Sequence, residues 1–162
     1  MWMAGVLRYR YIVRKHVAIH LYSGTKLINK REIYMKALYN DGSVAEVADE
    51  DVVHVIRHSA AHIMAQAIKR LYPEADFAYG PATDNGFYYD VDLGDKKISE
   101  DDLPAIEAEM KKIVKENLKF STFELPREEA VALMQERGEK YKVEHIGDLA
   151  EDARITFYQQ GE

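Results

Sequence analysis

The sequence contains no cysteine, and this absence excludes several kinds of chemistry. Without thiols, these 162 residues form no disulfide, no cysteine-ligated metal centre and no cysteine nucleophile. No apolar run approaches the roughly 18 residues that a membrane-spanning helix needs. Arginines and lysines interrupt the apolar stretches near the N-terminus, which argues against a secretory signal peptide. We therefore expect a cytoplasmic protein with no membrane partner.

Positive charge is scarce outside one end of the chain. Residues 1–34 hold seven Lys/Arg and one acid, whereas the other 128 residues hold fifteen bases and twenty-seven acids. The two parts, +6 and −12, add up to the overall net charge of −6. Residues 35–162 are too acidic to bind nucleic acid through their overall charge, and we expect no DNA partner. Any contact with RNA would use a local site or the basic extension at residues 1–34.

The rest of the composition, 47% apolar and 31% charged, is typical of a globular domain. Helix-like and strand-like segments alternate irregularly, which predicts an α+β fold. We expect a mostly antiparallel sheet packed against a long histidine-bearing helix and a second packing helix. The expected helices cover residues 51–72, 102–118 and 127–137, and the expected strands cover residues 76–80, 86–92, 119–125, 141–146 and 154–158.

Ahead of the long helix, residues 35–47 predict a small hairpin around Asp41-Gly42. A break in composition at Met35 separates this hairpin from the basic extension, which itself reads as one or two strands. We therefore divide the chain into the extension (1–34), a hairpin and linker (35–50) and a main domain (51–162).

The helix predicted over residues 51–72 carries His58 and His62. A spacing of four residues places both imidazoles on one helical face, one turn apart. An apolar stripe lies nearly opposite on the helical wheel, so we expect it to pack into the core while the other face presents the histidines. The stripe consists of Ile56, Ala60, Ile63, Ala67 and Leu71.

Two imidazoles at this spacing are half of a possible zinc site. Zinc takes four protein ligands in structural sites, and three plus water in catalytic sites. Ser59 follows His58, so the sequence lacks the zinc-peptidase pattern in which a glutamate follows the first ligand. His54 cannot complete the set, because it would lie about 11 Å from His62 on a straight helix. His58 and His62 are thus candidate ligands of an incomplete, weak zinc site, and ordinary packing or surface histidines are the alternative.

The second long helix reads as a packing element. Ser99 and Asp102 have the spacing of a capping box, which places the helix start near Asp102. We expect its buried stripe to consist of Leu103, Ile106, Met110, Ile113, Val114 and Leu118.

Four stretches of the sequence carry a family resemblance. They read RHSAAHIMAQAIKRLYP at 57–73, YGP at 79–81 with DNGFYYD at 84–90, ISEDDL at 98–103, and GEKYKV at 138–143. In this order they resemble the editing domain of bacterial-type threonyl-tRNA synthetases, over about residues 51–162. The match is much closer than the HxxxH pattern shared with alanyl-tRNA synthetases and their free-standing relatives.

The resemblance implies hydrolysis of serine wrongly attached to tRNA(Thr). One methyl group separates serine from threonine, and such a difference gives only ~1–3 kcal/mol of discrimination, so a second, hydrolytic step is needed. Carried over, His58 and His62 would position the attacking water or the ester, Lys142 would bind and polarise the substrate, and Tyr89 would line the site. As alternatives, Lys142 is a solvated strand lysine and Tyr89 an ordinary core residue.

The sequence also departs from the family pattern. In the family the HxxxH pair faces a Cys-x-x-x-His pair, which this sequence cannot supply, so we expect the chain alone to be inactive. The catalytic core, which would bind ATP and zinc, and the anticodon-binding domain are not recognisable. Residues 35–50 read as a possible remnant of the family's ubiquitin-like N-terminal domain. The implied partners are the aminoacylated 3′ end of tRNA(Thr) and the remainder of the synthetase.

Two other functions stay open from the sequence. One is a trans-acting deacylase of the alanyl type, which would also need the second pair of ligands. The other is a non-catalytic tRNA-binding or accessory module that uses the basic extension.

Overall fold

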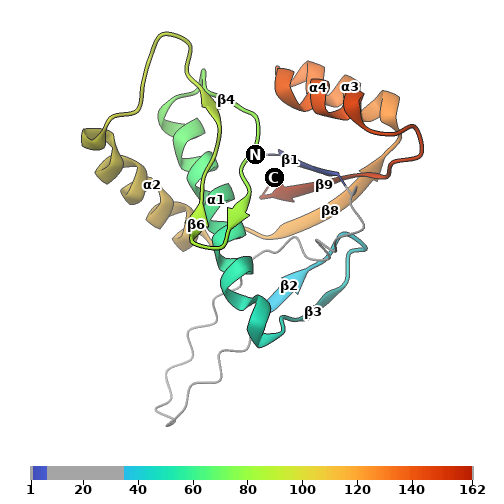
Figure 1. The fold of residues 1–162 in the computed structure, drawn as a ribbon, viewed down its shortest axis with the longest axis horizontal. Helices are drawn as coiled ribbons and strands as arrows, with labels where there is room; N and C mark the ends of the chain where they lie inside the picture. Colours follow the sequence, from blue (N-terminus) through green and yellow to red (C-terminus); the bar gives the residue numbers. More distant parts are fainter. Residues whose placement is uncertain (1, 7–34, 162) are drawn as a thin grey trace.

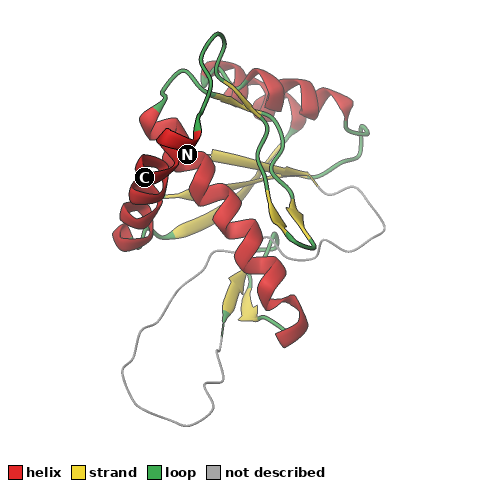
Figure 2. Cartoon of the chain, turned by 60° about the vertical axis from the view of Figure 1, so that its left-hand side comes forward, coloured by secondary structure: helices red, strands yellow, loops and turns green. Residues whose placement is uncertain are grey.

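The computed structural model describes residues 2–6 and 35–161. The strands expected in the basic extension lie outside the described residues, except for the segment 2–6. Within the described ranges the chain forms α-helices and small sheets whose strand pairs are all antiparallel (Figures 1 and 2). This confirms the predicted α+β class. None of the helices in these ranges is both long and apolar enough to cross a bilayer.

The largest sheet has the strand order β1-β9-β8. It consists of β1 (Trp2–Val6), β9 (Ile155–Gln160) and β8 (Phe120–Leu125), so segments from the two ends of the chain lie side by side in it. The central strand β9 is buried along almost its whole length. Phe123 and Phe157 are paired across β8 and β9, and their rings stack with centroids 5.2 Å apart. The strands predicted at 119–125 and 154–158 are therefore confirmed.

Two short helices, α3 (Arg127–Glu136) and α4 (Lys140–Asp148), cover one face of this sheet (Figure 1). Gly138 joins them with a φ of +70°, a left-handed conformation that glycine adopts without strain. Their buried side chains pack on the sheet in one core cluster. This cluster is formed by Ala130, Met134, Ile146, Ile155 and Phe157.

The strand predicted at residues 141–146 is wrong, because this segment belongs to α4. Its apolar residues Tyr141 and Val143 alternate with charged ones, and this alternation suggested a strand. The segment is too short for periodicity to separate the two structures, since Val143 and Ile146 also have helical spacing. Burial of Ile146 against Met134 of α3 decides in favour of the helix.

The helix predicted over 51–72 is confirmed as α1 (Val52–Leu71), entered through the 3-10 turn η1 (Asp49–Asp51). The second predicted helix is confirmed as α2 (Leu103–Glu116), which follows the 3-10 turn η2 (Glu100–Asp102). The capping box also forms, because Asp102 accepts hydrogen bonds from both the amide and the hydroxyl of Ser99.

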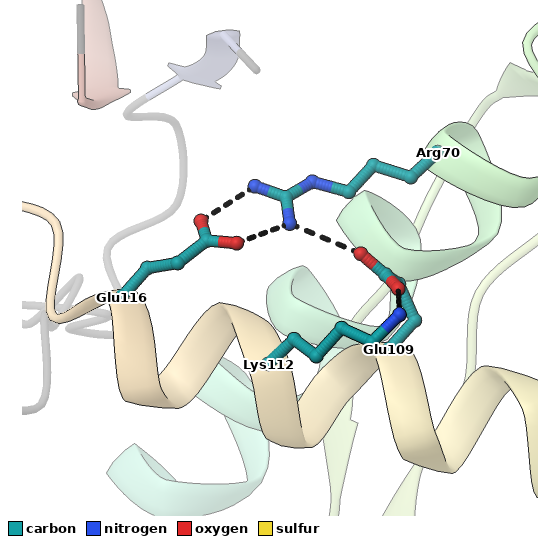
Figure 3. Close-up of polar contacts among 4 residues, drawn as sticks. All are labelled: Arg70, Glu109, Lys112 and Glu116. Atoms are coloured by element: carbon teal, nitrogen blue, oxygen red, sulfur yellow. Dashed lines mark hydrogen bonds and ion pairs between the residues drawn. The ribbon is translucent and has the colours of Figure 1, made fainter.

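Ion pairs join α1 to α2 (Figure 3). The Arg70 guanidinium binds the Glu116 carboxylate through two hydrogen bonds of 2.6 and 2.7 Å and reaches Glu109 at 3.1 Å. Lys112 in turn donates to Glu109 at 2.8 Å. Bidentate arginine–carboxylate contacts add geometric specificity as well as energy, so this group supports the apolar packing of α1 against α2.

The expected buried faces of both helices need correction. Ile56 and Leu71 of the α1 stripe are exposed, whereas Ala61 and Ala65, which flank the histidines, are fully buried. The histidines therefore lie within the buried arc of α1 and not opposite it. The physical reason is that the segments carrying β5 and β6 pack against α1, and Tyr89 of the following segment contacts His62. In α2, Ile106 and Ile113 are buried as expected, but Leu103 and Val114 are exposed.

Two hairpins complete the fold. The predicted 35–47 hairpin is confirmed as β2 (Lys36–Leu38) paired with β3 (Val44–Glu46). Residues 76–92 form the second, in which β4 (Asp76–Phe77) pairs with β7 (Val91–Asp92), and β5 (Ala82–Thr83) pairs with β6 (Gly86–Phe87). We call this second element the aromatic hairpin. Figure 2 shows it alongside α1.

Arg127 offers a test of how the α3–α4 pair is held. Its guanidinium donates to the main-chain carbonyls of Ile146, Leu149 and Ala150, where α4 ends. We expect Arg127→Ala to lower the free energy of unfolding by about 2–3 kcal/mol, because charged hydrogen bonds to part-buried carbonyls are lost. Urea denaturation measures this.

Arg154 provides the matched control. It is 71% exposed and pairs with Glu124 on the surface, so Arg154→Ala should cost no more than about 1 kcal/mol. Equal losses for the two variants would contradict a special role for Arg127.

Candidate functional site

The two predicted histidines contact each other on α1. Nε2 of His58 lies 2.8 Å from Nε2 of His62, and the ring centroids are 4.4 Å apart at an angle of 82°. This distance is that of a hydrogen bond, so one ring donates and the other accepts. The helix brings them together as their spacing predicts, and the small side chains of Ala61 and Ala65 leave room beside them.

This arrangement does not by itself fit a zinc ion. Two nitrogens bound to one tetrahedral zinc at about 2.0–2.1 Å would lie roughly 3.3 Å apart, which is farther than the observed separation. Within residues 2–6 and 35–161, no three His, Cys, Asp or Glu side chains gather into a group that could hold a metal.

Tyr89 lies next to the histidine pair. Its ring centroid is 6.2 Å from that of His62 and 5.4 Å from that of Phe77. Burial, and then the negative charge of Glu139, raise the pKa of Tyr89 to about 12. The phenol is therefore protonated at neutral pH and able to donate a hydrogen bond. Tyr89 also packs against the core shared by α1 and α2, so its role in binding a substrate stays a prediction.

Lys142 reaches this region from α4. Its ammonium lies 2.7 Å from the carboxylate of Glu139, and their side chains are only 13% and 17% exposed. The alternative of a solvated strand lysine is therefore wrong, because Lys142 is helical and largely buried. The negative charge of Glu139 contributes to the raised pKa of Tyr89. The structure thus gathers His58, His62 and Tyr89 through ring contacts, and it pairs Lys142 with Glu139 on α4.

Charged contacts anchor α4 to the aromatic hairpin. Lys140 binds Asp76 at 2.8 Å and Asp92 at 3.0 Å, and the Tyr141 hydroxyl donates to Asp92 at 2.8 Å. The amide of Gly94 and the side chains of Lys140 and Tyr141 hold the pKa of the Asp92 carboxyl well below its usual range. Because these residues directly precede Lys142 in the sequence, the anchor holds the part of α4 from which the Lys142 side chain projects.

Arg57 holds the far end of the aromatic hairpin. Its guanidinium donates to the main-chain carbonyls of Thr83, at 3.2 Å, and of Asp84. These carbonyls lie at the end of β5 and in the turn that leads to β6, and Arg57 directly precedes His58 on α1. The turn is therefore fastened beside the histidine pair.

Sequence reasoning missed Glu139, Asp92 and Arg57. The signal for Glu139 was present, since a glutamate three residues before a lysine forms an ion pair on a helix. That signal was hidden because residues 141–146 were read as a strand. No local pattern indicates Asp92 or Arg57, because their partners are distant in the sequence. Asp92 contacts residues 48 and 49 positions away. Arg57 contacts residues 26 and 27 positions away.

Comparison with known proteins gives close relatives but no matching family model. The chain is 57% identical over 122 residues to the threonine--tRNA ligase of Clostridioides difficile, which covers 75% of the chain and 19% of that protein. It is 60% identical over 114 residues to that of Clostridium acetobutylicum, covering 70% and 18%. It is 52% identical over 130 residues to that of Clostridium botulinum (strain Langeland), covering 79% and 20%.

These identities place the chain among the aminoacyl-tRNA synthetases. It belongs to the threonine--tRNA ligase family. The chain spans about a fifth of the length of these curated relatives.

Gly80 tests the packing of the aromatic hairpin. A Cβ atom at this position would lie 2.2 Å from Cδ2 and Cε2 of Tyr89, closer than atoms can approach. We expect Gly80→Ala to displace the Tyr89 ring and to lower the free energy of unfolding by about 1–3 kcal/mol, measured by urea denaturation. Gly86→Ala on the same hairpin is the control, because its Cβ would meet open space. Similar losses for both variants would contradict this packing.

Asp92 tests the anchor of α4. Its carboxyl has a lower pKa in the folded chain than in the unfolded chain, so it stabilises the fold at pH 7 and loses this effect as the pH falls. Asp92→Asn should lower the urea midpoint at pH 7, and the gap to the wild type should narrow below about pH 4. The exposed Asp95, changed to Asn, should leave the midpoint nearly unchanged at both pH values. A gap that does not vary with pH would contradict the anchor.

Proposed function

We propose that residues 51–162 form part of a site that hydrolyses seryl-tRNA(Thr), the editing reaction that supports accurate attachment of threonine to tRNA. The observation that carries the proposal is the contact between His58 and His62 beside Tyr89. The nearly buried Lys142–Glu139 pair supports it, because it belongs to the helix that Lys140 and Tyr141 hold against the aromatic hairpin. A hydrolytic site for an ester needs a base for water and a charge that stabilises the oxyanion, and these residues have both properties.

The histidines supply the base. The imidazole that donates the Nε2–H of this contact keeps an unprotonated Nδ1, which accepts a proton from the attacking water, and the hydrogen bond to the other ring fixes its tautomer and orientation. Water adds to the carbonyl carbon of the seryl ester. The bond from that carbon to the ribose oxygen then breaks, and the ribose oxygen takes up the proton. The products are free serine and uncharged tRNA.

Lys142 and Tyr89 act on the carbonyl side of the reaction. The ammonium of Lys142 polarises the ester carbonyl and stabilises the negative charge that develops on its oxygen. The protonated phenol of Tyr89 is a hydrogen-bond donor in the same region. Since both groups are largely buried, their interactions with a substrate are screened less than they would be in water.

The proposed partners are tRNA(Thr), through its aminoacylated 3′ end, and other parts of a threonine--tRNA ligase in the cytoplasm. The resemblance places a Cys-x-x-x-His pair opposite the histidines, and this sequence has no cysteine to supply it. We therefore propose that the other parts of a ligase complete the site and provide the core that binds ATP and zinc.

A chimera tests the proposal under conditions where the site is complete. Residues 51–162 replace the matching part of the Clostridioides difficile relative, and release of serine from seryl-tRNA(Thr) is measured. In this background His58→Ala and His62→Ala should each reduce the rate by about 10²–10⁴-fold, the usual contribution of general acid–base catalysis, while tRNA affinity stays unchanged.

His54 gives a matched control on the same helix. It is exposed and lies one turn before His58, so His54→Ala should retain the full rate. If all three variants hydrolyse the ester equally well, the histidine pair has no catalytic part and a tRNA-binding or accessory role is favoured. If the 162-residue chain alone matches the chimera, the expectation of an incomplete site is wrong.

A further inference from the structure

Glu139 is placed to do more than balance the charge of Lys142. It lies at the start of α4, where a carboxylate is favoured by the partial positive charge of the helix N-terminus. One oxygen, Oε2, accepts from Lys142 at 2.7 Å. A carboxylate has two oxygens with about four lone-pair sites, so Glu139 has the capacity to accept a second charged donor.

The substrate of the proposed reaction carries such a donor. An aminoacyl ester has an α-amino group on the carbon next to the carbonyl, and this group is protonated near neutral pH. Covalent geometry keeps its nitrogen roughly 3 Å from the carbonyl oxygen. A group that binds the α-ammonium must therefore lie beside the group that polarises the carbonyl, and Glu139 lies directly beside Lys142.

Charge balance supports the same assignment. A largely buried lysine alone would repel an approaching ammonium, because like charges interact strongly where water is scarce. The carboxylate of Glu139 neutralises Lys142 and leaves a pair with no net charge. A cation that reaches this pair meets an acceptor instead of an unbalanced positive charge.

We infer that Glu139 is a specificity-determining residue, whose carboxylate binds the α-ammonium of the aminoacyl ester while Lys142 contacts the carbonyl. The inference rests on the proposed function. It means that the site recognises esters of free amino acids and discriminates against acyl groups whose α-nitrogen is blocked.

The test uses the complete 162-residue chain and two stable probes, 3′-serylamino-3′-deoxyadenosine and its N-acetylated form. The probes have the same carbonyl and nucleoside, and only the first has an ammonium group. Calorimetric titration at pH 6.5 should show that the wild type binds the free amine at least about tenfold more tightly than the acetylated probe. Glu139→Gln should bind both probes alike.

Two further variants separate recognition from structure. Glu144 is exposed on the same helix, so Glu144→Gln should keep the tenfold preference. Glu139→Asp retains the carboxylate and should restore part of the preference that Glu139→Gln loses. A merely structural Glu139 would instead weaken the binding of both probes by the same factor when changed to Gln.

The remaining outcomes overturn the inference in distinguishable ways. If the wild type binds both probes with equal affinity, or Glu139→Gln keeps the tenfold preference, the α-ammonium is not bound by Glu139 although the site still binds an aminoacyl nucleoside. If the wild type binds neither probe, Glu139 recognises no α-ammonium in this chain and the inference is overturned, whereas release of serine by the chimera still decides the proposed function.

Discussion

The candidate site depends on how closely the aromatic hairpin packs against α1. Alanine at positions 61 and 65 gives α1 a buried face of small side chains around the histidines. Gly80 likewise leaves no Cβ between the hairpin backbone and Tyr89. Larger side chains at these positions would separate the two elements and move Tyr89 away from His62. Small residues at these positions therefore allow the rings of His62 on α1 and Tyr89 on the aromatic hairpin to come into contact.

The second requirement is that α4 be held against the hairpin. An isolated nine-residue helix is not stable in water, so α4 depends on its neighbours for its existence as well as its position. Burial of Ile146 holds one side of it, and the contacts of Lys140 and Tyr141 with Asp92 hold the other. Lys142 lies between these attachments in the sequence, and Glu139 directly precedes the first of them.

Much of the fold could be predicted from the sequence, and the errors have physical causes. The ends of α1 and the capping box of α2 follow from local rules, and both were predicted. Which face of α1 is buried depends on the elements that pack against it. The helical wheel contains no information on those elements, and the face that it predicts to be buried is wrong. Residues 141–146 alternate like a strand but pack like a helix, and only the contact of Ile146 with Met134 decides between them. His58 and His62 follow from their spacing, and Lys142 and Tyr89 follow from the family resemblance. Glu139 follows from its spacing to Lys142 only once residues 139–142 are known to be helical.

The bond between Arg57 and the turn of the aromatic hairpin has a consequence for sequence variation. Arg57 binds main-chain carbonyls of Thr83 and Asp84, and every amino acid supplies a carbonyl. The tether thus constrains the path of the turn and leaves the identity of its side chains free. Residues 83–85 could diverge, or be randomised in a library, while the turn keeps its place beside the histidines. The backbone of this segment is fixed while its side chains are free to vary. Substitutions there can therefore change the substrate preference of such a site without changing the fold.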